Sequence, residues 1–299
     1  MSRQIGSLSA LDDKEGTQIP GSLPTVIDAH VHLFPDELFA AIWAWFDKFA
    51  WPIRYKLDSQ GVIEFLLSRG IDRIVGLHYA HRPGIARHLN RYMASLCKSC
   101  PQLIGTATIF PGEKADRDIL EEAFQMGLAG VKLHSHVQFF SMDSPEMHEI
   151  YEICSEYQKP LIMHVGREPK SPVFNYKTDP YEICGADKVE PVLKGYPNLN
   201  VIVPHLGADE YAAFAKLIHD YDNLWLDIAM VLADYLPQTN PPKLSEMRSD
   251  RVLYGTDFPH LPYAWDRELK RLCALGLSES DLAMVLGGNA LSLFLDSRE

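Results

Sequence analysis

The chain has 299 residues, 46% hydrophobic and 23% charged, which is ordinary for one globular domain with a large core. Its 28 basic and 40 acidic residues give a formal net charge of −12 at pH 7. That charge opposes non-specific binding to nucleic acid or to an anionic membrane. The composition therefore predicts neither kind of partner.

Residues 1–24 mix Ser, Gly, Asp and Lys without a hydrophobic period, and they are predicted to form a short arm before a domain of residues 25–299. The arm has no apolar stretch of signal-peptide length, and no run of 18 apolar residues occurs in the sequence. Five cysteines, an odd number, favour reduced thiols. We therefore expect a cytoplasmic protein, and the sequence leaves a homo-oligomer open.

The first strand-like segment ends in two histidines that are separated by one residue. Side chains of an extended strand alternate between two faces, so His30 and His32 are expected to project to the same side. Two imidazoles placed in this way can share one metal ion. Taken alone, the motif also fits a surface strand with two solvated histidines.

Further apolar segments of strand type also end in residues that can bind metal or transfer protons. In chain order these residues are His134, His164, His205 and Asp257. Three more strand-like segments without an obvious ligand raise the total to eight: residues 71–78, 103–109 and 224–230.

Segments with helical periodicity separate the predicted strands. They cover residues 61–69, 82–97, 113–126, 145–158, 189–196 and 209–221. Strands that alternate with helices indicate βαβ units and a parallel sheet, and eight units suit a (β/α)8 barrel, for which about 250 residues is typical. In the rival fold, an open doubly wound sheet, ligands would gather at one switch point. We predict an α/β fold, a single (β/α)8 TIM barrel with a short N-terminal arm.

The C-terminal strand ends of such a barrel form its active face, so the ligand-type side chains would meet there. His30, His32, His164 and Asp257 supply three nitrogens and one oxygen, a set suited to one divalent ion, with zinc preferred. Such an ion lowers the pKa of a bound water to about 7 and so produces a nucleophile. His205 is predicted to be a general acid or base, and Asp257 is expected to accept a proton while it holds the metal.

In this order, the motifs resemble the amidohydrolase superfamily, and within it the amidohydrolase-related (amidohydrolase 2) branch of metal-dependent TIM-barrel proteins. The resemblance rests on residues 27–32, 130–134, 163–166, 204–207, 255–259, 288–290 and 293–294. It implies a mononuclear site in which His30, His32, His164 and Asp257 bind the metal and His205 is catalytic. The branch includes hydrolases, lactonases and enzymes like aminocarboxymuconate-semialdehyde decarboxylase.

Lys132 lies two positions before His134, so the two side chains are expected on the same face of the fourth predicted strand. In some members of the wider superfamily, a carboxylated lysine on the fourth strand bridges two metals. An unmodified ammonium group would instead repel a nearby cation and neutralise an anionic substrate. We favour one metal, with Lys132 and His134 shaping the substrate pocket.

Arg54 and Arg167 are expected in or near loops around the barrel mouth, where their guanidinium forks suit a substrate carboxylate. Because arginine is mostly exposed in proteins, both also fit plain surface positions. We assign them to substrate binding, which points to a small, anionic substrate.

The sequence thus predicts a metal-dependent hydrolase that uses a metal-activated water on a C–N or cyclic ester (lactone) bond. The alternative is a metal-dependent decarboxylase of a small unsaturated or aromatic acid, which a strong carboxylate clamp at Arg54 would favour. A non-enzymatic barrel with a structural metal is the weakest reading, because structural zinc sites are closed and His205 would be an extra base at the mouth.

Overall fold

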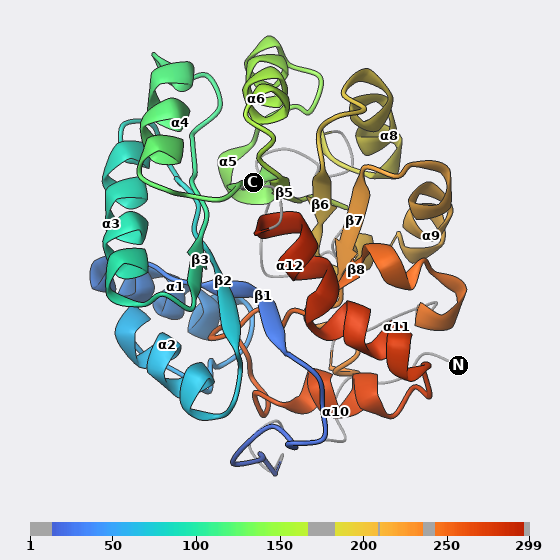
Figure 1. Cartoon of the computed structure of the whole chain (residues 1–299). Helices are drawn as coiled ribbons and strands as arrows, with labels where there is room; N and C mark the ends of the chain where they lie inside the picture. The colour runs from blue at the N-terminus through green and yellow to red at the C-terminus, as the bar shows by residue number, and fades with distance from the viewer. Residues whose placement is uncertain (1–13, 167–182, 209, 236–242, 296–299) are drawn as a thin grey trace.

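The computed structural model describes residues 14–166, 183–208, 210–235 and 243–295 (Figure 1). The described strands are β1 Ile27–His32, β2 Arg73–Leu77, β3 Leu103–Gly105, β4 Val131–His134, β5 Leu161–His164, β6 Val201–Val203, β7 Leu224–Asp227 and β8 Val252–Leu253. The described α-helices are α1 Asp36–Phe49, α2 Ser59–Ser68, α3 Ala86–Ser99, α4 Asp116–Gln125, α5 Ser135–Gln138, α6 Pro145–Glu156, α8 Ala186–Gly195, α9 Tyr211–Asp220, α10 Arg267–Cys273, α11 Glu279–Ala283 and α12 Asn289–Phe294. Shorter helical turns are η1 Pro204–Gly207, η2 Leu244–Glu246, η3 Ser249–Arg251 and η4 Met284–Gly288.

The strands are parallel and form two hydrogen-bonded groups, β1 to β3 and β4 to β8, each in chain order. Backbone hydrogen bonds bridge both seams between the groups. At one seam Lys132 N donates to Ala107 O (2.8 Å), and at the other Asp257 N donates to His30 O (2.9 Å). The strands therefore follow one another around a ring, with helices outside it (Figure 1). The predicted (β/α)8 barrel is confirmed, and an open sheet is not what the chain forms.

Helix α12 lies across the N-terminal ends of the strands, in front of the ring in Figure 1. Its buried side chains, among them Leu293 and Phe294, pack against strand residues such as Ile27, Ile162 and Ile202. This contact fills the bottom of the barrel with apolar groups. The predicted ligands His30, His32 and Asp257 lie toward the opposite, C-terminal ends of the strands.

Helix α1 is an addition to the elements predicted from the sequence. Its aromatic residues Phe39, Trp43 and Phe46 are spaced by three or four positions, so they share one helix face. The Phe39 and Trp43 rings stack at 5.4 Å, and Phe46 stacks on His260 at 5.2 Å. The helix therefore packs beside the segment that follows β8, near the C-terminal end of the barrel.

The part of the predicted N-terminal arm that the structure describes lies against the barrel. Gly16 N donates to Asp266 Oδ2 (2.8 Å), and Trp265 Nε1 donates to Gly16 O (3.0 Å). Ile19 N donates to Arg69 O (2.8 Å). Residues 14–24 are thus held by the segments around α2 and α10, while the boundary at residue 25 stays a prediction.

Replacing Phe294 by alanine should lower the free energy of unfolding by about 3–5 kcal/mol, because it removes a large buried ring and leaves a cavity. Phe294 is 2% exposed, whereas Phe139 is 37% exposed and serves as a matched control. Urea denaturation followed by circular dichroism measures both variants. Phe139→Ala should change stability by less than about 0.5 kcal/mol, and an equal loss in both variants would contradict the role of α12.

Candidate active site

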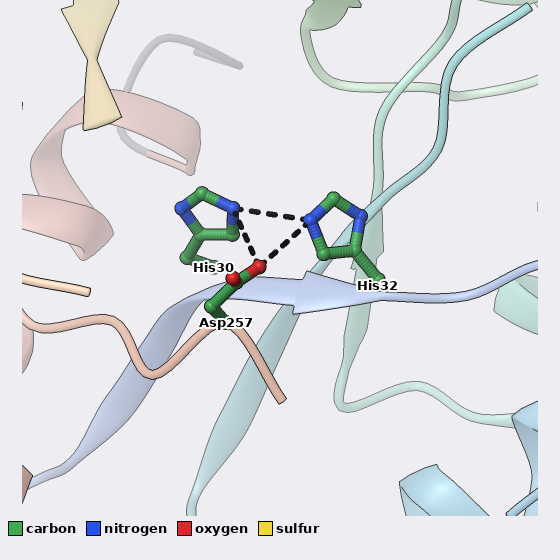
Figure 2. Close-up of side chains that lie close together, drawn as sticks. All are labelled: His30, His32 and Asp257. Carbon is green, nitrogen blue, oxygen red and sulfur yellow. Dashed lines mark hydrogen bonds and ion pairs between the residues drawn. The ribbon is translucent and has the colours of Figure 1, made fainter. Parts of the chain in front are cut away.

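Three predicted ligand residues meet at the C-terminal ends of β1 and β8 (Figure 2). His30 Nε2 and His32 Nε2 lie 3.3 Å apart. Asp257 Oδ1 lies 2.9 Å from His32 Nε2 and 3.4 Å from His30 Nε2. One ligand atom of each residue lies within 4.8 Å of the other two. Residues from the two ends of the sequence thus form one compact cluster of donors.

The chemistry of this cluster fits a divalent ion. Burial lowers the pKa of His30 and of His32, so both imidazoles are neutral at pH 7. Burial alone would raise the pKa of Asp257, but its hydrogen bond with His32 and the other imidazoles bring that pKa below its usual value. Two neutral imidazoles and one carboxylate are ligands that zinc and other first-row metals accept, and an ion would replace the hydrogen between His32 and Asp257.

Asp227, the last residue of β7, forms a hydrogen bond with the ring nitrogen of His30 that does not face His32. His30 Nδ1 donates to Asp227 Oδ2 (2.8 Å), which leaves the lone pair of His30 on Nε2, the atom that faces His32. Burial raises the pKa of Asp227. A carboxylate in this place fixes the tautomer and orientation of a metal-binding histidine. This strand was predicted from the sequence without a ligand, although an apolar run that ends in Asp was the available signal.

His205 lies just after β6, beside the cluster. Its Nδ1 donates to Ala229 O (2.8 Å), so its lone pair is on Nε2. That nitrogen lies 3.2 Å from His164 Nδ1, and the His205 ring lies 5.1 Å from the ring of His30. The predicted base is therefore adjacent to the candidate metal ligands, with a defined tautomer.

His164, at the end of β5, lies next to His205 rather than within the group of three donors. The ring centroids of His164 and His205 are 4.7 Å apart. If His164 Nδ1 donates to His205 Nε2, the lone pair of His164 is on its Nε2. Its assignment as the fourth metal ligand stays a prediction.

Lys132 and His134 occupy β4, where they pair in register with Ile162 and His164 of β5. Lys132 is completely buried inside the barrel. Burial is the main cause that lowers the pKa of His30, and the nearby charge of Lys132 is the next. The ring of His134 stacks on that of His164, with centroids 4.0 Å apart. Both residues adjoin the candidate site, and their substrate contacts stay predictions.

The structure describes only one of the two arginines that were predicted to bind substrate. Arg54 Nη2 forms an ion pair with Glu15 Oε2 (3.2 Å), which ties its guanidinium to the N-terminal arm. Arg167 lies outside the described residues. Substrate binding by either arginine therefore stays a prediction.

The backbone is strained at two candidate catalytic residues. His205 has φ 57° and Asp257 has φ 71°, both in the left-handed region. Such strain is common at active sites and costs about 1–3 kcal/mol for each residue. Close packing also requires a glycine at position 255, because a Cβ there would lie 2.8 Å from the Cβ of His30.

His260 is a second addition to the site predicted from the sequence. It is 3% exposed, and its ring stacks on that of His32 with centroids 4.7 Å apart. Burial lowers the pKa of His260 to about 3. Its position three residues after Asp257 was the only signal in the sequence.

Parallel strands around a ring, with histidines and an aspartate at their C-terminal ends, define a TIM-barrel enzyme of metal-dependent type. A sequence model of the family described as Amidohydrolase matches residues 27–295. The chain therefore belongs to the amidohydrolase family, whose members are metal-dependent enzymes that act on small molecules. No curated protein matches the chain in sequence.

Solved structures with this fold include an uncharacterised TIM-barrel protein from Bordetella bronchiseptica, with 19% identity and a TM-score of 0.66 over 90% of this chain and 98% of that one. A 5-carboxyvanillate decarboxylase from Novosphingobium aromaticivorans, complexed with manganese and a nitrobenzoic acid, has 17% identity and a TM-score of 0.67, over 94% and 99%. A probable 2-pyrone-4,6-dicarboxylic acid hydrolase from Acinetobacter baumannii, with citric acid bound, has 16% identity and a TM-score of 0.61, over 90% and 99%. These likenesses confirm the fold.

Replacing His30 and His32 together by alanine should abolish metal binding, because it removes both nitrogens of the donor cluster. The wild-type protein should hold close to one divalent ion per chain in elemental analysis. His148→Ala, which removes an exposed histidine of α6, is the control and should retain the ion. Thermal melting checks that the double variant folds. Equal metal content in the wild type and the folded double variant would refute the site.

Proposed function

We propose that the protein is a metal-dependent hydrolase of a C–N or cyclic ester (lactone) bond in a small, anionic molecule. One divalent ion, zinc in preference to others, would be held by His30, His32, His164 and Asp257. The observation that carries the proposal is the combination of a metal-type donor cluster with His205 beside it. Because Ala229 O fixes the tautomer of His205, its Nε2 carries the lone pair that can accept a proton, and this nitrogen lies 3.2 Å from His164 Nδ1.

An ion at this cluster supplies a Lewis acid that polarises a substrate oxygen and lowers the pKa of water. His205 Nε2 accepts the proton of the attacking water and then returns it to the leaving nitrogen or oxygen. Asp227 accepts a hydrogen bond from the backbone N–H of His205 (2.9 Å), which keeps the imidazole in place during both transfers. The lowered pKa of Asp257 suits a ligand more than a base, so we assign it the smaller share of proton transfer.

The state of Arg54 favours hydrolysis over decarboxylation. A decarboxylase would need a strong clamp for the substrate carboxylate, and Arg54 was the predicted candidate. Its ion pair with Glu15 already neutralises its charge within the chain. Decarboxylation is the second candidate because solved decarboxylases share the fold, and in that reaction His205 would protonate the carbanion.

The charge of the protein bears on its partners and its location. We propose a small-molecule substrate, no nucleic-acid or membrane partner, and a cytoplasmic location, in keeping with the net charge of −12. Among the residues that the structure describes, none of the helices has the length and apolar character needed to cross a bilayer.

Replacing His205 by asparagine should leave metal content unchanged and lower turnover by roughly 10²- to 10⁴-fold, the usual scale of general acid or base assistance. The substrates to test are simple lactones, amides and 2-pyrone-4,6-dicarboxylic acid, with 5-carboxyvanillate and 2,6-dihydroxybenzoate as decarboxylase substrates. His219→Asn, at an exposed histidine of α9, is the control.

The wild-type reaction in water labelled with heavy oxygen distinguishes the two candidate functions. Hydrolysis should place one labelled oxygen in the product. Release of one carbon dioxide per turnover, without label in the organic product, would replace the hydrolase by the decarboxylase.

Replacing Lys132 by methionine should keep one metal per chain and raise KM for an anionic substrate. The buried charge acts in a medium of low polarity, where its attraction for an anion is strong. A raised KM with unchanged kcat indicates a contact that is equal in the ground and transition states. Loss of a second metal equivalent in this variant would instead support a carboxylated lysine that bridges two ions.

A further inference from the structure

The two histidines of β1 differ in what holds their rings. His30 is oriented by Asp227, which accepts the hydrogen bond from its Nδ1. The Nδ1 atom of His32 is buried and has no hydrogen-bond partner among the described residues. Histidines that bind metals are usually oriented by a hydrogen bond at the second ring nitrogen. The ring of His32 must therefore be oriented in another way.

Aromatic rings are stacked against the ring of His32. The His260 ring lies 4.7 Å from it at an interplanar angle of 24°, and the Phe34 ring lies 5.8 Å from it at 11°. Phe46 stacks in turn on His260, at 5.2 Å and 27°. We call these four residues, Phe34, His32, His260 and Phe46, the ring stack.

The ring stack connects three separate segments of the barrel. His32 and Phe34 belong to β1 and the residues directly after it, Phe46 belongs to α1, and His260 follows β8. His260 is anchored by its backbone, because its N–H donates to Asp257 O (3.0 Å) and its carbonyl accepts from Trp51 Nε1 (2.7 Å). Because its backbone is anchored, the ring of His260 has little freedom to move, and it can restrict the tilt of the neighbouring His32 ring.

Stacking fixes the orientation of His32 that matters for a metal. Phe34, His32 and His260 are all at most 5% exposed, so the plane of His32 cannot tilt without breaking buried contacts. Within that plane, the contact with Asp257 directs Nε2 toward the donor cluster (2.9 Å). Each aromatic contact is worth about two- to tenfold in an equilibrium constant.

We propose that His260 is a positioning residue that fixes the plane of the His32 ring by stacking. The ring of His30, in contrast, is oriented by the carboxylate of Asp227. The inference rests on the metal site of the proposed function, and it holds for a hydrolase and a decarboxylase alike. It requires the flat ring of His260 rather than its nitrogens. The rival role for His260 is a direct hydrogen bond from Nε2, which has no partner among the described residues, to the substrate.

The test is a titration of metal-free protein with Co²⁺, without substrate, followed by visible absorption. The intensity and wavelength of the cobalt bands report the ligand geometry. His260→Ala should weaken Co²⁺ binding roughly tenfold and change the bands, because the ring stacked on His32 is lost together with its contacts to Phe46 and Phe39. His260→Phe should bind within about twofold of the wild type, with its bands restored, because a phenyl ring keeps the stack.

A matched control is His78→Ala. His78 is 1% exposed and bonds Asn90 Oδ1 at 3.2 Å, but no ring contact joins it to His32 in the described structure. It should bind Co²⁺ as the wild type does, even if it melts at a lower temperature. Phe46→Leu removes only the outer ring and should weaken binding about twofold, which keeps the test valid if His260→Ala fails to fold.

The possible results distinguish the positioning role of His260 from a substrate contact, and the metal site from the proposed function. Wild-type affinity and bands in His260→Ala would overturn the positioning role, and a raised KM in that variant would then support the substrate contact. Equal weakening in His260→Ala and His260→Phe would also overturn it, because the nitrogens would be what matters. Absence of Co²⁺ binding by the wild type would refute the metal site together with the inference. Normal metal binding without hydrolysis of any substrate would refute only the proposed function.

Discussion

The buried carboxylate of Asp227 is the group on which the arrangement of the candidate site depends. It accepts hydrogen bonds from His30 Nδ1 and from the backbone N–H groups of His205 and Ala229. A candidate metal ligand and the candidate base are thus oriented by one side chain. Ala229, held by the same carboxylate, supplies the carbonyl that fixes the tautomer of His205.

This dependence explains why so many polar groups are tolerated inside the barrel. Burial of a carboxylate is costly unless its oxygens are hydrogen-bonded, and three donors satisfy Asp227. Asp28 is likewise a buried carboxyl group with a hydrogen-bond donor. Burial raises its pKa to about 7, and the hydroxyl of Thr256 donates a hydrogen bond to Asp28 Oδ2 (2.6 Å). The apolar contact of α12 at the other end of the barrel stabilises the fold that carries these groups.

The aromatic groups beside the site have a different part in its construction. The segment after β8 brings His260 to the ring of His32, and helix α1 brings Phe46 to the ring of His260. His30 is held by a hydrogen bond, which fixes a direction, and His32 by stacked rings, which fix a plane. Because these rings also exclude water, charges of the site interact through a less polar medium than bulk water.

Local patterns in the sequence were sufficient to predict the barrel, the paired histidines and the residues at the ends of the other strands. Hydrophobic periodicity and residue type are properties of short segments, so they can be read without knowledge of distant contacts. The structure confirms the barrel and groups His30, His32 and Asp257, while the roles of His164 and Lys132 stay predictions.

Only the tertiary structure showed the partners that these residues have. His30 and Asp227 are separated by 197 residues, and closure of the strand ring alone makes them neighbours. The same applies to His260 on His32 and to Glu15 on Arg54. In each pair, the local sequence of either segment is compatible with several different neighbours. The sequence by itself therefore determined which chemical groups reach the active face, and the packing of the barrel decided which of them touch.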